Sequence, residues 1–99
     1  MILKYGLDIE KEAIKASLGR LTNQVYKLLP LREEGGDWQR PLENIMEELA
    51  GIDRLFIDQQ VVLYKLFCKL EGLFVLDQEE DFMTYRGVIF ECLGLLGEL

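Results

Sequence analysis

The fold of this 99-residue chain is decided by one stretch, Leu42-Glu43-Asn44-Ile45-Met46-Glu47-Glu48-Leu49-Ala50-Gly51-Ile52-Asp53-Arg54-Leu55-Phe56. Apolar side chains recur in it at steps of three and four residues, which places them on one face of an α-helix. They are Leu42, Ile45, Leu49, Ile52 and Phe56. The other face is mainly charged. The stretch therefore predicts an amphipathic helix over residues 40–57, with Pro41 tolerated in its first turn.

The chain before this stretch carries the same pattern. Its apolar residues follow a 4-3-4-3 spacing and are Ile14, Leu18, Leu21, Val25 and Leu28. The ring of Pro30 clashes with a continuing helical turn, so we predict a helix over residues 8–29. The segment from Arg32 to Asp37 has no periodicity and contains the pair Gly35-Gly36, which predicts a loop.

The segment after residue 57 is apolar on nearly all sides, which predicts a helix over residues 59–74. Such a helix must be covered on nearly all sides, either by a central position or by a second chain. No Gly or Pro separates it from the preceding helix. One long bent helix is therefore an alternative to two separate ones.

The last segment begins with an acidic run from Asp77 to Asp81. Asp77 and Glu80 have the spacing of a helix capping box, and a helix is predicted over residues 78–97. Its apolar stripe consists of Phe82, Tyr85, Ile89, Leu93 and Leu96. Further apolar residues broaden this stripe beyond what one core contact needs.

Four helices with one short loop and no domain boundary predict an all-α fold, a small four-helix bundle formed by a single domain over residues 1–99. Residues 37–55 match residues 81–99 at a shift of 44 positions. This match indicates two related α-hairpins. Two leucine-rich amphipathic helices also match in this way by chance.

Histidine is absent, and the two cysteines are Cys68 and Cys92. The lack of His excludes Ser–His and Cys–His triads and zinc sites with His ligands. Two cysteines are too few for a four-thiolate metal site. Both lie on apolar helix faces, so we expect both to be buried as small hydrophobic residues. No cofactor is expected.

The chain has 18 acidic and 11 basic residues, a net charge of −7. The basic residues are spread along the sequence, whereas nucleic acids and anionic membranes require concentrated positive charge. We therefore expect neither as a direct partner. The acidic balance favours a basic protein partner, or it is simply a solvated surface. No apolar run approaches the roughly 18–20 residues of a membrane span, and no secretion signal begins the chain, so a cytoplasmic location is expected.

The best candidates for catalysis are the carboxylates of the 40–57 helix: Glu43, Glu47 and Glu48. Carboxylates one turn apart on facing helices can hold Mg²⁺. The run Glu47-Glu48-Leu49-Ala50 superficially resembles the acidic helix of the all-α nucleoside triphosphate pyrophosphohydrolases. That family has Asp three residues after a Glu, where this chain has Gly51, and the family's earlier paired-Glu helix is missing. The alternative for these carboxylates is a solvated helix face.

Several other side chains are candidates for contact with a protein partner. They are Trp38, Arg40, Asp77, Glu79, Glu80, Asp81 and Phe90. Trp and Arg are favoured interface residues, although a Trp at a loop–helix junction also commonly closes a core. The acidic run could imitate phosphates toward a basic surface, or serve only as a solvated helix N-terminus.

The sequence therefore favours a small acidic interaction protein, an adaptor or inhibitor that acts by docking and not by catalysis. Phage and mobile-element accessory proteins that block host nucleic-acid-binding enzymes often have this size and character. One alternative is a structural homo-oligomer, expected as a homodimer, in which the last two helices pair with those of a second copy. The other is a Mg²⁺-dependent phosphohydrolase that uses Glu43, Glu47 and Glu48.

Overall fold

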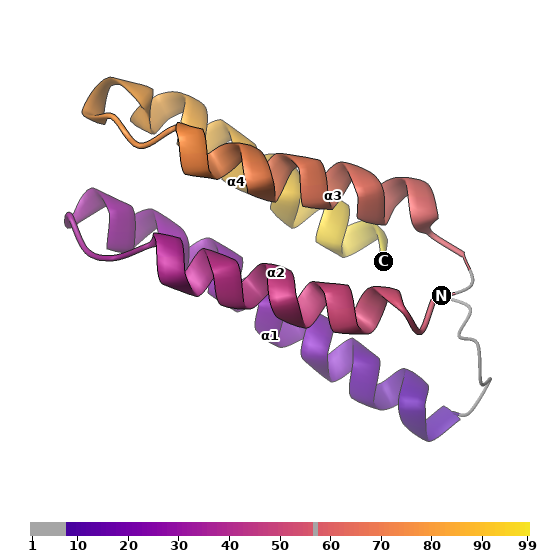
Figure 1. Cartoon of the computed structure of the whole chain (residues 1–99). Helices are drawn as coiled ribbons and strands as arrows, with labels where there is room; N and C mark the ends of the chain where they lie inside the picture. The colour runs from indigo at the N-terminus through magenta and orange to yellow at the C-terminus, as the bar shows by residue number, and fades with distance from the viewer. Residues whose placement is uncertain (1–7, 57) are drawn as a thin grey trace.

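The four predicted helical segments form four α-helices in the computed structural model, which describes residues 8–56 and 58–99 (Figure 1). The helices are α1 (Asp8–Glu33), α2 (Gln39–Asp53), α3 (Gln60–Gly72) and α4 (Phe82–Glu98). Two 3₁₀ turns, η1 (Leu73–Val75) and η2 (Glu79–Asp81), lie between α3 and α4. The predicted all-α four-helix bundle is confirmed.

The helices are arranged as two antiparallel hairpins, α1–α2 and α3–α4, whose turns lie at the same end of the molecule (Figure 1). We call this the loop end. Helix α4 packs against both α3 and α1, which closes the bundle. The molecule measures 45 × 21 × 18 Å. The two α-hairpins are thus present as structural units, while their origin from a related sequence stays a prediction.

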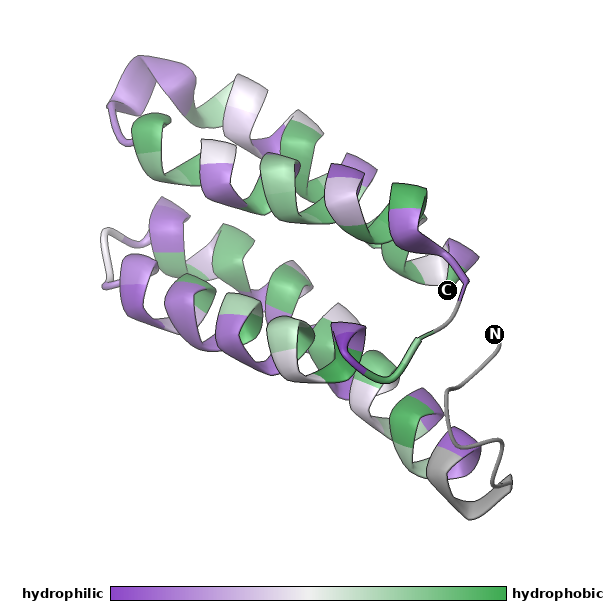
Figure 2. Cartoon of the chain, turned by 45° about the vertical axis from the view of Figure 1, so that its right-hand side comes forward, coloured by the Kyte–Doolittle hydropathy of each residue, from purple (hydrophilic) through white to green (hydrophobic). Residues whose placement is uncertain are grey.

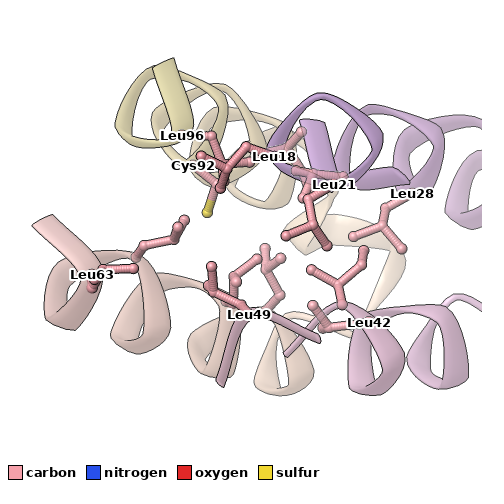
Figure 3. Close-up of a cluster of buried hydrophobic side chains, with 14 of the residues drawn as sticks. Leu18, Leu21, Leu28, Leu42, Leu49, Leu63, Cys92 and Leu96 are labelled. Carbon is pink, nitrogen blue, oxygen red and sulfur yellow. The ribbon is translucent and has the colours of Figure 1, made fainter. Parts of the chain in front are cut away.

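Each helix buries one apolar stripe, and the four stripes meet inside the bundle. Figure 3 shows part of this core, formed by Leu18, Leu21 and Leu28 of α1, Leu42 and Leu49 of α2, Leu63 of α3, and Cys92 and Leu96 of α4. Burying a Leu side chain contributes about 1.5–3 kcal/mol relative to leaving it in water. The predicted stripes of the first two helices are buried in full.

The prediction that Pro30 ends the first helix is wrong, because α1 continues to Glu33. Proline removes one backbone N–H but does not prevent a further turn. The helix stops at Gly35, whose φ of 78° is left-handed. The N–H of Gly36 bonds to the carbonyl of Leu31 at 2.8 Å, and that of Gly35 to the carbonyl of Arg32 at 3.1 Å. This is a Schellman C-cap, which requires a residue without Cβ strain.

The alternative of one long bent helix across residues 40–74 is also wrong. Helix α2 ends at Asp53, and the next turn is tightened by a bond from the N–H of Phe56 to the carbonyl of Asp53. Gln59 then adopts φ 68°, which breaks any helical continuity. Gln59 is not glycine, so this conformation costs free energy. The break turns the chain back and lets α3 run antiparallel to α2 (Figure 1).

The last forty residues are not fully covered by the bundle. Five of the exposed large hydrophobic side chains lie there: Val61, Tyr64, Val75, Met83 and Phe90. The first two belong to the outer side of α3, opposite its buried stripe. Cys68 lies on that outer side as well, so the prediction that it is buried is wrong, whereas Cys92 is buried as predicted. Within the described residues, no helix combines the length and apolarity needed to span a bilayer.

Candidate functional site

The described surface contains a cleft of about 800 Å³ at the loop end, between the α1–α2 turn and the start of α4. We call it the loop-end cleft. Its lining residues are Arg32, Glu33, Gly35, Gly36, Trp38, Gln39, Asp77, Glu79, Glu80, Phe82 and Met83. They come from both hairpins, although the two contributing segments, residues 32–39 and 77–83, are 38 positions apart at their nearest ends. The cleft therefore exists only when the hairpins are packed together.

Arg32, in the last turn of α1, holds the two hairpins together at this cleft. Its Nη2 donates hydrogen bonds to the carbonyls of Leu76 and Gln78, each at 2.7 Å, and its Nε donates to the carbonyl of Leu76 at 3.2 Å. Hydrogen bonds from a charged donor are about twice as strong as neutral ones. The extension of α1 beyond Pro30 is what places Arg32 within reach of these carbonyls.

Three aromatic rings surround the Arg32 guanidinium. Its Cζ lies 4.6 Å from the ring centroid of Tyr85, 5.5 Å from that of Phe82 and 5.9 Å from that of Trp38. A cation over an aromatic face is attracted by the negative charge of the π-system. Arg32 is thus committed to carbonyls and rings, and it is the one basic residue among those that line the cleft.

Trp38 closes the core at the loop end and is only 5% exposed. Its ring meets Tyr85 edge-on at 5.1 Å and stacks on Phe74 at 6.3 Å. It also contributes to the lining of the cleft. Of the two interpretations of Trp38 from the sequence, the structure supports the core position, so a partner could touch only a small part of this side chain.

Tyr85, whose ring packs against Arg32 and Trp38, carries a polar atom without a partner in the described part of the chain. The residue is fully buried, and its hydroxyl makes no hydrogen bond within the described part of the chain. Burial raises the pKa of the phenol well above its ordinary range, partly opposed by the nearby Arg32 charge. A buried hydroxyl without a partner costs about 1–3 kcal/mol. Such a group in a native structure requires an explanation.

The rim of the cleft is acidic. Carboxylates of Glu33, Asp77, Glu79 and Glu80 line it, and the polypeptide around η2 appears as a hydrophilic stretch at one end of Figure 2. Among the predicted partner-binding residues, the structure brings Trp38, Asp77, Glu79 and Glu80 to this one place. It adds Phe82 and Met83, whose side chains provide apolar surface, and Met83 is 70% exposed.

Asp81 caps the turn η2, a role that the sequence analysis predicted for the pair Asp77 and Glu80. Its carboxylate accepts the backbone N–H of Gln78 at 3.4 Å. The capping pair is therefore Gln78 and Asp81, one residue after the predicted pair of Asp77 and Glu80. Asp77 and Glu80 instead line the cleft, where the Asp77 carboxylate accepts a hydrogen bond from the side-chain amide of Gln78 at 3.2 Å.

Besides Asp81, two further predicted partner-binding residues lie outside the cleft lining. Arg40 is exposed in the first turn of α2, where its backbone N–H bonds to the carboxylate of Asp37 at 3.3 Å. Phe90 lies on the outer side of α4, 44% exposed, with the Arg86 guanidinium 4.8 Å from its ring centroid. Neither side chain adds to the surface around Glu79 and Glu80.

The carboxylates of α2 are not gathered into a metal centre in the described residues. Glu43 and Glu47 are exposed, while Glu48 turns toward α1 and pairs with Arg20 at 3.4 Å. Across residues 8–56 and 58–99, no group of three His, Cys, Asp or Glu side chains is placed to hold a metal ion. The geometry gives the phosphohydrolase hypothesis no support.

The two thiols differ in exposure, because Cys68 is exposed and Cys92 is buried. Burial raises the pKa of the Cys92 thiol to about 12, which the nearby Lys69 charge partly opposes. The Lys69 ammonium forms an ion pair with Glu91 across the α3–α4 interface. A thiol becomes a nucleophile by losing its proton, so Cys92 is inert in the folded protein.

Comparison of the chain with family models, curated proteins and solved structures gives no match. Function must therefore be inferred from the cleft.

Proposed function

We propose that this protein is a protein–protein interaction module that binds a basic partner through the loop-end cleft, without catalysis. The observation that carries the proposal is the set of residues that line the loop-end cleft. Four carboxylates and the apolar side chains of Phe82 and Met83 converge on a cleft that both hairpins build. Apolar surface supplies affinity on burial, and a ring of like charges supplies selection for partners of opposite sign.

Rigidity of the cleft supports the proposal. Arg32 fixes the backbone at Leu76 and Gln78, the residues that flank Asp77. A preorganised site loses less conformational entropy when a partner binds than a mobile one does. The acidic rim is thus presented by a held backbone and not by a free tail.

In its specific form, the proposal is that the protein inhibits a nucleic-acid-binding enzyme. Carboxylates on a rigid surface can occupy the place of nucleic-acid phosphates on a basic enzyme, which is how a phage accessory protein would block a host nucleic-acid-binding enzyme. The net charge of −7 also steers the protein toward such a surface over distances of about a Debye length.

The test uses two double variants of equal charge change. Glu79→Gln with Glu80→Gln neutralises the rim, whereas Glu43→Gln with Glu47→Gln neutralises exposed carboxylates of α2. Partners that co-purify with the wild-type protein from its native cell are identified, and their Kd is measured across a salt series. We expect the rim variant to weaken binding at least tenfold and the α2 variant to weaken it less than twofold. Equal effects of both variants, or affinity independent of salt, would contradict the proposal.

A second candidate function, a structural homo-oligomer, is favoured by the exposed apolar residues of α3 and α4. Tyr64 is 72% exposed and Val61 67%, on a helix that otherwise contributes buried leucines to the core. Such side chains can pair with those of a second copy. Sedimentation equilibrium at tens of micromolar distinguishes the two functions, because a strict monomer excludes the homo-oligomer and leaves the docking proposal intact.

A further inference from the structure

We infer that the outer face of α3 pairs with the same face of a second copy of this chain, with the two helices antiparallel and Cys68 on the twofold axis. This inference goes beyond binding at the loop-end cleft and rests on the second candidate function, whose interface it specifies. We call this surface, which continues onto the turn η1, the α3 outer face. Its residues are Val61, Tyr64, Lys65, Cys68, Glu71, Gly72 and Val75.

The α3 outer face carries apolar side chains that are exposed along its whole length. Val61, Tyr64 and Val75 are each at least 67% exposed, and the exposed Cys68 lies between them. Helices α2 and α4 contact α3, and they leave this stripe uncovered. From Val61 to Val75 a helix that rises about 1.5 Å per residue extends about 21 Å, which is long enough for a helix–helix contact of several turns.

The apolar residues and the glycine of this face are arranged symmetrically about Cys68. Val61 and Val75 lie seven positions before and after it. Tyr64 and Gly72 lie four positions before and after it. In an antiparallel pair with a twofold axis at Cys68, residues at equal distances from the axis lie at the same level of the two helices. The large Tyr64 of each copy then meets the small Gly72 of the other, so the face is complementary to itself.

Gly72 has no explanation within a single copy of the chain. Its φ of −62° and ψ of −22° are ordinary helical values, and a Cβ added to it would meet no side chain of the described residues within 4 Å. A larger residue could therefore occupy this position, and alanine would favour the helix more than glycine does. A residue without a side chain does permit the close approach of a second helix. We assign that space to Tyr64 of the second copy.

Opposite charges lie on the two sides of the twofold axis. Lys65 and Glu71 are three positions before and after Cys68, and neither belongs to an ion pair among the described residues. Antiparallel pairing brings the Lys65 of each copy to the level of the Glu71 of the other, whereas parallel pairing would bring like charges together. Charge complementarity therefore selects a second copy, in the antiparallel direction, as the occupant of this face.

The first test compares Gly72→Gln with the matched control Gly19→Gln. Both glycines are exposed in helices, and a Cβ at either one meets no neighbour within 4 Å, so both variants should keep the wild-type helix content in circular dichroism. Sedimentation equilibrium over a concentration series up to tens of micromolar measures the Kd of the dimer. We expect Gly72→Gln to weaken the dimer at least tenfold and Gly19→Gln to change its Kd less than twofold.

The second test reverses the charges beside the axis. Lys65→Glu makes the net charge of the chain more negative and Glu71→Lys makes it less negative, yet each places like charges at the same level of the antiparallel pair. We expect each single variant to weaken the dimer at least fivefold, and the double variant to return its Kd to within twofold of the wild-type value. Neither a general charge effect nor parallel pairing would weaken the dimer in both single variants.

The third test uses Cys68 as a probe of the axis. Helices packed about 8–10 Å apart bring two facing Cα atoms to within about 6 Å, a separation that a disulfide can span. Oxidised glutathione accepts the two electrons and two protons of a Cys68 pair and leaves as two molecules of glutathione. We expect a covalent dimer on a non-reducing gel. Cys68→Ser with Gly19→Cys, which moves the exposed thiol to α1, is the control and should give none.

The outcomes separate this inference from the functions on which it does and does not depend. A strict monomer at tens of micromolar would overturn the inference together with the second candidate function, and would leave binding at the loop-end cleft intact. A dimer that ignores Gly72→Gln and both charge reversals would overturn the inference alone, because the copies would then associate through another face. A dimer in which Cys68 forms no disulfide would do the same.

Discussion

The two hairpins share one architecture but differ in what they show to solvent. In the α1–α2 hairpin, one large hydrophobic side chain, Tyr26, is exposed among the described residues. The α3–α4 hairpin and its connection expose five. The interior of the bundle needs only one apolar stripe per helix, and both hairpins supply it. The additional exposed hydrophobic side chains of the second hairpin therefore do not serve the core. They are candidates for contact with another molecule.

The connections between the helices of the two hairpins also differ, in length and in charge. The α1–α2 turn is short and ends α1 with the glycine cap at Gly35. The α3–α4 connection is longer, with two 3₁₀ turns and a run of carboxylates. A stable bundle needs only a short turn to join antiparallel helices. The longer connection contributes Asp77, Glu79 and Glu80 to the lining of the cleft.

The largest expected loss of stability tests whether the two hairpins contribute equally to the core. Leu49→Ala in the first hairpin and Leu66→Ala in the second each remove a fully buried side chain. We expect each to lower the free energy of unfolding by about 2–5 kcal/mol, with values within about 1.5 kcal/mol of each other. Urea unfolding followed by Trp38 fluorescence and by circular dichroism measures both. A much smaller loss in one hairpin would show that the hairpins do not share a single cooperative core.

The next effect concerns the residue that joins the hairpins. Arg32→Met keeps an apolar stem but leaves the carbonyls of Leu76 and Gln78 without their donor. We expect a loss of about 1–3 kcal/mol in the free energy of unfolding. Arg54→Met, at an exposed position of the first hairpin, is the matched control and should stay within about 0.5 kcal/mol of wild type. Equal losses for both variants would mean that Arg32 does not join the hairpins.

A smaller effect follows from the cysteines, which both belong to the second hairpin. Burial raises the pKa of Cys92 from 9.0 to about 12, so above pH 9 the unfolded chain releases a proton that the folded protein retains. Stability must fall as pH rises through this range. At pH 10 the loss is about 1.4 kcal/mol, relative to neutral pH. Urea unfolding of the wild type and of Cys92→Ala from pH 7 to 10 should show a flatter dependence in the variant. Identical slopes would disprove the burial of this thiol.

The smallest effect on stability tests the exterior. Tyr64→Ser and Phe90→Ser in the second hairpin, with Tyr26→Ser in the first as control, change exposed residues. Each should alter the free energy of unfolding by at most about 0.5 kcal/mol. If the second hairpin mediates self-association, the first two variants shift sedimentation toward monomer and the control does not. A loss of stability above 2 kcal/mol in either would show that its side chain belongs to the core.

The helical stripes could be predicted from the sequence because burial of one face has a fixed period. Leu21 and Leu49 were recognisable from spacing alone, and both are fully buried. Pro30 was misleading, because a proline near a helix end removes a bond that one further turn can do without. Cys68 was misassigned because a helix that is apolar all round gives no periodic signal for its outer side.

The site could be predicted only in part. The acidic run and Trp38 stood out by composition, but Arg32 did not, because its partners are backbone carbonyls forty-four and forty-six positions away. Carbonyls are present at every residue and leave no trace in a sequence. The orphaned hydroxyl of Tyr85 is likewise a property of three-dimensional packing, and it could be recognised only once the neighbouring rings were placed.

The packing of α4 against α1 joins the last helix to the first. During synthesis, the leucine stripe of α1 leaves the ribosome long before α4 has been translated. Until α4 emerges from the exit tunnel, the apolar stripe of α1 lacks the helix that covers it in the folded bundle. The bundle is thus completed only after α4 has been synthesised, and a chaperone that shields α1 during that interval would raise the yield of folded protein.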